Sequence, residues 1–154
     1  MDNTNEPETQ MLVDAPEDLQ VVAFRLGKEE YAVNILHVQE INRLLNITRV
    51  PRTEKYIKGV VNLRGNIVPV INLHTRFGLL PDGDPEDRRI IVFHFDELKV
   101  GVIVDEVSEV LHIKAGDIEE TTKVYDSAHA EHIKGVAKVD ERLLILLDLK
   151  KTFE

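Results

Sequence analysis

The chain contains no cysteine and no tryptophan. The lack of cysteine excludes disulfides, thiolate metal sites and a cysteine nucleophile, and nothing in the sequence argues for an oxidising compartment. Aromatic residues reach only 5% of the total, so the core has to be built from aliphatic side chains. Grooves that bind proline-rich peptides are lined with aromatic side chains, and this sequence has too few to build one.

Positive charge is also in short supply, because 28 acidic residues outnumber 19 basic ones and give a net charge of -9. An acidic chain repels phosphate backbones and anionic lipid surfaces, so neither a nucleic-acid partner nor direct membrane contact is expected. No apolar run approaches the roughly 20 residues of a membrane-spanning helix. The opening residues, MDNTNEPETQ, are acidic and polar, whereas a signal peptide begins with basic residues and continues with an apolar stretch. The sequence therefore predicts a cytoplasmic protein.

Alternating apolar residues begin at Val21. The stretches VVAFRL and YAVNI, separated by the turn-like GKEE, alternate with a period of two and predict a β-hairpin. After them Ile35, Val38 and Ile41 recur at every third residue, which indicates that a helical turn or a bulge interrupts the next strand. A second hairpin is expected between VVNLR and IVPVINL, with its turn at Gly65-Asn66, because glycine accepts a positive φ.

The same pattern occurs twice. Residues 90–95 (IIVFHF) repeat residues 21–26 (VVAFRL) at an offset of 69, and residues 133–149 repeat residues 57–73 at an offset of 76. A longer second connecting loop, residues 112–132, accounts for the change in offset. Each copy offers about four or five short strands, which is too few for an open sheet to bury both faces, so closure into a small barrel is expected. The duplication predicts an all-β protein with two small barrels side by side.

The expected domain limits follow from composition. Residues 1–18 mix polar and acidic residues without periodicity and predict a flexible acidic tail. The rest, residues 19–154, forms one domain with barrel halves at roughly 19–79 and 88–154, separated by the acidic, proline-containing linker 80–87. The last strand of each half is apolar on both faces, so one face can fill its own barrel and the other can meet the neighbouring barrel. An exchange of terminal strands between the halves is possible.

Three glycines are expected to have structural roles. Gly59 and Gly135 open the repeated strands at equivalent places, which points to a backbone geometry that both copies need. Gly65 belongs to the predicted turn. Pro69 lies inside a strand pattern although it cannot donate a ladder hydrogen bond, which suggests an edge position or a bulge.

No motif in the sequence indicates catalysis. The nucleophile-elbow, zinc-protease, phosphate-loop and dinucleotide-binding patterns are absent, and the paired carboxylates Asp105 and Glu106 fall at a strand-end turn with no partner base evident. His129 and His132, in HAEH, come closest to a metal site, but no third ligand follows at a recognised spacing, and a solvated surface is the simpler interpretation. The acids of residues 80–87 do not follow the order of an EF-hand loop. We expect no enzyme, no metal and no cofactor.

One part of the repeated stretch differs between the copies: Leu-Arg-Gly around Arg64 becomes Val-Asp-Glu around Asp140. One interpretation is drift on a solvated turn, because a lone surface charge usually contributes little. The alternative hypothesis is that Arg64 and Glu40 lie close together at one end of the first barrel and organise a docking surface. In the second copy the equivalent residues are Asp140 and Glu109, which could only repel each other.

Together these residues resemble the chemotaxis coupling protein family, CheW. The matching stretches run from about Val21 to Phe153 and include FRLGKEEYAVNILHVQEI, ITRVP, YIKGVVNLRGNIVPVINL, RIIVF, VGVIVDEVSEVL and IKGVAKVDERLLILLDL. NLRG followed by PVINL is specific when it accompanies the other blocks. The resemblance implies two five-stranded SH3-like β-barrels with short helical turns. It also implies a non-catalytic scaffold that couples the cytoplasmic tips of chemoreceptors to the regulatory domain of the histidine kinase CheA.

The resemblance further implies where partners bind. In the family the receptor tip, a helical hairpin, lies against an apolar groove between the halves. Carried over residue by residue, the groove and its rim take in Ile35, Val38, Glu40, Val104 and Val107, with Arg64 nearby. The kinase's regulatory domain resembles this protein, so the two can alternate in rings. The free protein is expected to be a monomer, recruited to receptor arrays at the inner face of the membrane.

Two rival functions stay open from the sequence. A coupling domain fused to a phosphorylatable receiver is the nearest relative in function, and it is disfavoured because the chain ends at Glu154, directly after the second barrel. An enzyme with an unrecognised site belongs to a different class. It would need convergent polar side chains that the sequence does not identify.

Overall fold

The computed structural model describes residues 18–51, 56–120 and 132–153. The predicted tail, residues 1–18, lies outside the described residues except for Asp18. The strands are β1 (Asp18–Leu26), β2 (Glu29–Asn34), β3 (Val38–Arg43), β4 (Ile57–Leu63), β5 (Asn66–Ile71), β6 (Arg89–Phe95), β7 (Leu98–Val104), β8 (Glu106–Lys114), β9 (Ile118–Glu120), β10 (Ile133–Val139) and β11 (Arg142–Leu147). The helices are the single 3-10 turns η1 (Ile35–His37), η2 (Pro85–Asp87) and η3 (Ala115–Asp117), and the short α-helices α2 (Leu73–Phe77) and α4 (Leu149–Thr152).

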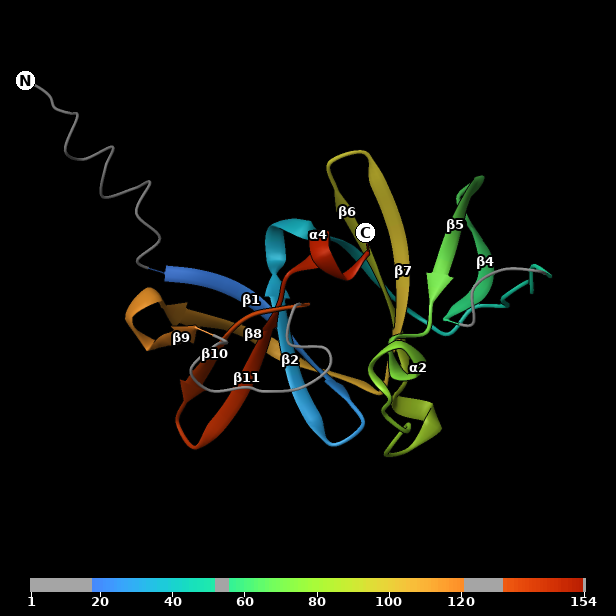
Figure 1. Ribbon diagram of the computed structural model, residues 1–154. Helices are drawn as coiled ribbons and strands as arrows, with labels where there is room; N and C mark the ends of the chain where they lie inside the picture. Colours follow the sequence, from blue (N-terminus) through green and yellow to red (C-terminus); the bar gives the residue numbers. More distant parts are fainter. Residues whose placement is uncertain (1–17, 52–55, 121–131, 154) are drawn as a thin grey trace, which may run out of the picture.

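The strands form two sheets that lie side by side in Figure 1. One has six strands in the order β8-β1-β2-β11-β10-β9, and the other has five in the order β3-β6-β7-β5-β4. The all-β prediction is confirmed. The six-stranded sheet exceeds the expected five strands because β9 pairs with β10, whereas the corresponding part of the first copy makes only an isolated bridge between Thr48 and Val60.

The two sheets do not follow the consecutive halves 19–79 and 88–154, because strands are exchanged between them, the alternative that the sequence left open. Each copy's first hairpin lies between strands of the other copy: β1 pairs with β8 and β2 with β11, while β6 pairs with β3 and β7 with β5. This exchange pairs both edges of each hairpin, which on its own would be only marginally stable. The acidic segment 80–87 therefore connects α2 to β6 and does not separate the sheets.

Three hydrophobic clusters fill the structure. The largest takes buried side chains from both sheets, including Phe24 and Phe93. Each of the two smaller clusters draws on one sheet alone. Strand β11 shows the division, because Ile145 belongs to the central cluster whereas Leu144 and Leu146 belong to that of the six-stranded sheet. The expectation that the last strands are apolar on both faces is confirmed, and each fully buried large side chain stabilises the fold by about 1.5–3 kcal/mol.

The described hairpins close with two-residue turns whose first residue has a positive φ. These first residues are Gly27 (64°), Arg64 (53°), Asp96 (52°) and Asp140 (58°). The turn predicted at Gly65-Asn66 lies one residue earlier, because Leu63 pairs with Asn66 and leaves Arg64 and Gly65 (84°) as the turn. Positive φ at both turn residues matches the twist of the flanking strands. Arg64 and Asp140 thus share a backbone conformation although their charges are opposite.

The predicted interruption after the first hairpin is confirmed, and it contains both a helical turn and a bulge. Helix η1 is followed by a shift in the pairing of β3 with β6, between Val38 and Glu40. The second copy repeats the bulge, since the pairing of β1 with β8 passes over Ser108. The second connecting loop begins later than expected, because β8 continues to Lys114 and is followed by η3 and β9. Residues 121–131 lie outside the described residues.

Gly59 and Gly135 lie where two segments of backbone approach closely. A Cβ atom at Gly59 would lie 2.2 Å from the carbonyl oxygen of Thr48, and one at Gly135 would lie 2.7 Å from that of Glu119. Cβ atoms do not tolerate either distance, so both positions require glycine for the same reason.

Pro69 is not on an edge strand, which corrects one of the two expectations for it. Strand β5 pairs with β4 on one side and with β7 on the other. The ladder with β7 begins only at Val70, so Pro69 has a paired neighbour on the β4 side alone. The missing N–H donor is tolerated because Pro69 precedes the two-sided part of the strand.

Candidate functional site

Within the described residues the chain crosses between the two sheets at two places, and the predicted groove residues lie at these crossings. The first crossing is η1, between β2 and β3, and the second is Asp105, between β7 and β8. Ile35 and Val38 at the first crossing and Val107 at the second are partly buried and pack against the central hydrophobic cluster. The structure therefore brings three of the predicted apolar residues to one cluster from two distant parts of the chain.

Val104 does not lie on the surface. It is the last residue of β7, it has 0% exposure, and it belongs to the central cluster. A side chain that points into the core cannot contact a partner while the core is intact. The expectation that Val104 lines a groove is corrected, and the apolar surface at the crossings consists of Ile35, Val38 and Val107.

Glu40 and Arg64 form an ion pair. Nη1 of Arg64, in the turn between β4 and β5, donates to both carboxylate oxygens of Glu40 on β3, with 2.9 Å to Oε1. Nδ2 of Asn42 donates to the same carboxylate at 3.0 Å. The hydrogen bonds from Asn42 and Arg64 lower the pKa of Glu40 below its ordinary value, so the carboxylate stays ionised. The glutamate side chain is only 14% exposed whereas the arginine is 75% exposed, which leaves the guanidinium accessible to a partner.

The equivalent glutamate of the second copy also has an arginine beside it, contrary to the expected repulsion. Nη1 of Arg142 donates to Glu109 at 2.6 Å, and its Nε and Nη2 donate to Glu30 at 3.1 and 2.6 Å. The hydrogen bonds with Glu30 raise the pKa of Arg142, although burial opposes this. The repeat alignment missed this contact, because Arg142 lies two positions after Asp140 and has no arginine counterpart in the first copy.

Glu30, the main partner of Arg142, also has a shifted pKa. Burial raises the pKa of Glu30, but hydrogen bonds from Arg142 and Ser108 and the charges of Arg142 and Arg25 together lower it below the ordinary value. The carboxylate is therefore held in its ionised form by its neighbours on three strands. Arg142, Glu30 and Glu109 therefore connect strands within the six-stranded sheet.

Each copy also leaves two large aliphatic residues exposed at equivalent positions. In the first copy these are Ile41 (40% exposed) and Ile67 (64%), and in the second they are Val110 (48%) and Leu143 (48%). Ile41 and Val110 lie on β3 and β8, the strands of Glu40 and Glu109, and Ile67 and Leu143 lie on β5 and β11. Each sheet therefore presents aliphatic and charged side chains on equivalent strands. In a protein-binding surface, aliphatic groups of this kind supply the apolar part and charged groups supply the rim.

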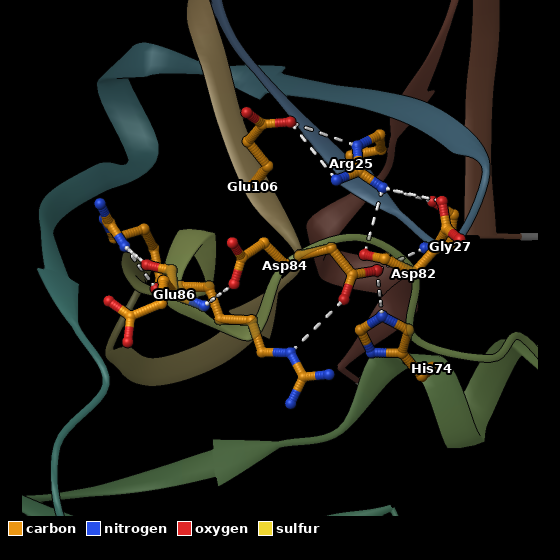
Figure 2. A network of polar contacts seen from close by, with 10 residues as sticks. Arg25, Gly27, His74, Asp82, Asp84, Glu86 and Glu106 are labelled. Atoms are coloured by element: carbon orange, nitrogen blue, oxygen red, sulfur yellow. Dashed lines mark hydrogen bonds and ion pairs between the residues drawn. The ribbon is translucent and has the colours of Figure 1, made fainter.

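A buried polar network surrounds Asp105 at the second crossing, and Figure 2 shows its partners Gly27 and His74. The Asp105 side chain is 1% exposed, and its Oδ2 accepts from the backbone N–H of Gly27 at 2.6 Å and contacts Nε2 of His74 at 2.8 Å. Nε of Arg88 lies 3.9 Å from Oδ1. The expectation that this acid has no partner base is therefore wrong, since the base is 31 residues away in the sequence. Among the described residues no hydroxyl or thiol contacts this imidazole, so a hydrolytic triad is not assembled there.

His132 makes structural contacts. Its ring stacks on Phe77 with centroids 5.7 Å apart, and Nδ1 lies 3.2 Å from the carbonyl oxygen of Lys151. His129 lies outside the described residues. Within residues 18–51, 56–120 and 132–153 no group of three His, Cys, Asp or Glu side chains is placed to hold a metal ion. No helix in that part of the chain is long and apolar enough to cross a membrane.

Comparison with known proteins agrees with this architecture. The CheW-like domain family matches residues 20–154. The chain is 39% identical to a chemotaxis protein CheW of Klebsiella aerogenes over 86% of this chain and 80% of that one. It is 37% identical to the chemotaxis protein CheW of Helicobacter pylori over 91% of this chain and 87% of that one.

A solved structure shows the same fold. The scaffolding protein TtCheW from Thermoanaerobacter tengcongensis superposes with a TM-score of 0.76 and 38% sequence identity, over 84% of this chain and 88% of that one. The family match, the identity with curated relatives and the shared fold cover nearly the whole described chain. The chain therefore belongs to the CheW family of chemotaxis scaffold proteins.

Proposed function

We propose that this protein is the non-catalytic adaptor that couples the cytoplasmic helical tips of chemoreceptors to the regulatory domain of the histidine kinase CheA. The observation that carries the proposal is the pair of equivalent surfaces, one per sheet, each with two exposed aliphatic residues and a glutamate–arginine pair. An adaptor needs at least two separate contact surfaces. A duplicated fold supplies one outer surface on each sheet, and the crossings between the sheets supply a third.

The receptor contact is assigned to the surface at the two crossings. Ile35, Val38 and Val107 are partly exposed there above the central cluster, and a helical hairpin can bury such side chains with the apolar face of one helix. Glu40 and Arg64 belong to the rim, where the exposed guanidinium can exchange its carboxylate for one on the partner. Rim charges of this kind contribute more to orientation and association rate than to affinity.

The kinase contact is assigned to the outer surfaces of the sheets. A regulatory domain that resembles this protein presents equivalent surfaces, so the two proteins can alternate head to tail, and such heterologous contacts close into rings. The free chain is then a monomer in the cytoplasm. It joins receptor arrays at the inner face of the membrane, where several small contacts act together through effective concentration.

Reconstitution tests the proposal. The protein is mixed with the kinase and with soluble receptor tips, and kinase phosphorylation is measured with and without receptor ligand. We expect ligand control of the kinase only when the adaptor is present. If neither partner binds it and receptor control is the same without it, the adaptor function is wrong.

A further inference from the structure

The two crossings between the sheets are held in different ways. At the first crossing, Asn34 caps η1 locally, with its side chain accepting from the N–H of Leu36 at 2.9 Å. At the second crossing the chain is tied to distant elements. The Asp105 N–H donates to the carbonyl oxygen of Arg25 at 2.9 Å, and its carboxylate binds Gly27 of the β1–β2 turn and His74 of α2.

The network around Asp105 connects both sheets. Gly27 and Arg25 belong to the first hairpin of the six-stranded sheet, whereas His74 lies in α2, directly after β5 of the five-stranded sheet. The Arg25 guanidinium extends the network, because it donates to the carbonyl oxygen of Gly27 at 2.9 Å and lies 3.3 Å from carboxylate oxygens of Asp82 and Glu106. Figure 2 shows Arg25 between Glu106 on one side and Gly27 and Asp82 on the other, with His74 below them.

The duplication did not preserve this network. At the offset of 69 residues the counterpart of Asp105 is Leu36, which is 84% exposed, and at the offset of 76 the counterpart of His74 is Lys150, which is exposed. The first crossing is made without a buried carboxylate, so a crossing between the two sheets does not in itself require one. Burying a carboxylate costs free energy unless it is well bonded, so Asp105 needs an explanation beyond stability.

We infer that Asp105 and His74 are positioning residues that set the angle between the two sheets. The short hydrogen bonds of one carboxylate oxygen hold the β1–β2 turn against α2 at a single relative position. Val107 follows Asp105 by two residues, and Ile35 and Val38 lie on the other crossing, so the angle between the sheets sets the spacing of the apolar residues assigned to the receptor. The functional consequence rests on the proposed receptor contact, whereas the geometrical statement does not.

Electron-spin distance measurement tests the geometrical statement directly. The natural chain has no cysteine, so two introduced cysteines can be labelled without background. Asn62 on β4 and Lys138 on β10 are exposed and equivalent, one on each sheet, and Asn62→Cys with Lys138→Cys gives a full-length reporter. The comparison is made between this reporter, its Asp105→Asn form and a matched control, Asp96→Asn, which changes an exposed aspartate at another turn.

We expect one narrow distance distribution for the reporter and for Asp96→Asn, and a broadened or shifted distribution for Asp105→Asn. His74→Leu, which leaves the Gly27 hydrogen bond in place, should broaden it less, and His74→Gln, which keeps a donor, should restore it towards the parent. His74→Leu decides the question if Asp105→Asn does not fold. An unchanged distribution in the folded variants would overturn the inference, since a merely stabilising role lowers the melting temperature without altering the distance.

Binding of the soluble receptor tip is measured on the same proteins. If the competent angle falls to a tenth of the population in Asp105→Asn, apparent affinity falls roughly tenfold. If the parent protein does not bind the tip, the proposed receptor contact is wrong. The inference about the sheet angle is then tested by the spin-label distances alone. Parent protein that binds, together with a broadened Asp105→Asn variant that binds equally well, would show that the sheet angle does not control the receptor surface.

Discussion

Each copy places an arginine beside the equivalent glutamate, Glu40 in the first copy and Glu109 in the second. The two arginines come from different positions in the repeat. In the first copy Arg64, in the turn, is 75% exposed and binds one carboxylate, that of Glu40. In the second copy Arg142, at the start of β11, is 33% exposed and binds both Glu109 and Glu30. The counterpart of Glu30 in the first copy, at the offset of 69, is Lys99, so no second carboxylate is available there.

Because of this difference, the ion pairs of Arg142 stabilise the fold, whereas the guanidinium of Arg64 is exposed and accessible to a partner. Arg142 connects β2, β8 and β11 through two carboxylates, and removing it would leave Glu30 partly buried without its main partner. Arg64 can leave Glu40 with little loss, because Asn42 and the charge of Lys99 still stabilise that carboxylate. A duplicated fold can therefore keep one copy of a contact for stability and use the other for recognition.

The largest expected effect comes from the paired glycines. Gly59→Val should lower the free energy of unfolding by roughly 3 kcal/mol or more, because the new Cβ meets a backbone carbonyl that cannot move aside. Gly135→Val should cost less, since the equivalent approach is 2.7 Å rather than 2.2 Å. Urea denaturation of both variants measures the difference. If the urea unfolding curve of Gly59→Val matches that of the wild type, the segment that carries Thr48 can move away from the new side chain.

The second prediction concerns the embedded arginine. Arg142→Met should lower the free energy of unfolding by about 1–2 kcal/mol, because the partly buried Glu30 loses its hydrogen bonds from Arg142 and keeps only that from Ser108. Adding Glu30→Gln to this variant should recover part of the loss, since the unpaired charge is then removed as well. Denaturant unfolding of the two single variants and the double variant gives the coupling. Additive losses would mean that Arg142 stabilises the sheet through packing alone.

Acid titration of stability tests the same cluster independently. The pKa of Glu30 is lower in the folded state than the ordinary value of 4.5, so its contribution is fully present above that pH and is lost as the pH falls through the folded pKa. Glu30→Gln should therefore be less stable than the parent at pH 7, and the two should converge at low pH. Thermal melts between pH 7 and pH 3 measure this. Arg142→Met should flatten the curve in the same way, because Arg142 is the main lowering influence.

The sequence predicted the repeated elements well because their signals are local. Alternation from Val21 and the three-residue spacing at Ile35 each depend on neighbouring residues, and the glycines Gly59 and Gly135 stand out because the repeat keeps both. The hairpins, the interruption and the two-faced last strands follow from them. Strand exchange stayed an open alternative, because a hairpin shows the same alternation whether it pairs with its own copy or with the other.

Contacts between distant residues were the least predictable part of the site. The Glu40–Arg64 contact was proposed because the repeat differed there, but the same comparison concealed Arg142, which lies two positions away from the aligned residue. His74 and Asp105 carry no shared motif, and only the packing of α2 against the second crossing brings them together. Val104 was assigned to the groove through the resemblance to the CheW family, and its burial depends on which face of β7 meets the central cluster.

The smallest expected effect on stability, and the sharpest test of the comparison, comes from Arg64→Asp, which gives the first copy the residue of the second. Both positions have the same positive φ, near 53° and 58°, and aspartate tolerates it, so stability should change by about 0.5 kcal/mol or less. Binding to the kinase or receptor tip should weaken nonetheless, because the exposed guanidinium is replaced by a like charge beside Glu40.

The control is Arg64→Asn, which keeps the turn and removes only the charge. The double swap Arg64→Asp with Glu40→Arg restores opposite charges at the contact, and partner binding measured by calorimetry should recover part of what each single change loses. If the double swap recovers nothing while Arg64→Asn alone binds as weakly, the guanidinium acts on the partner directly and its pairing with Glu40 has no part in binding. Early melting of Arg64→Asp would instead make this arginine structural, like Arg142, and remove the distinction between the two copies.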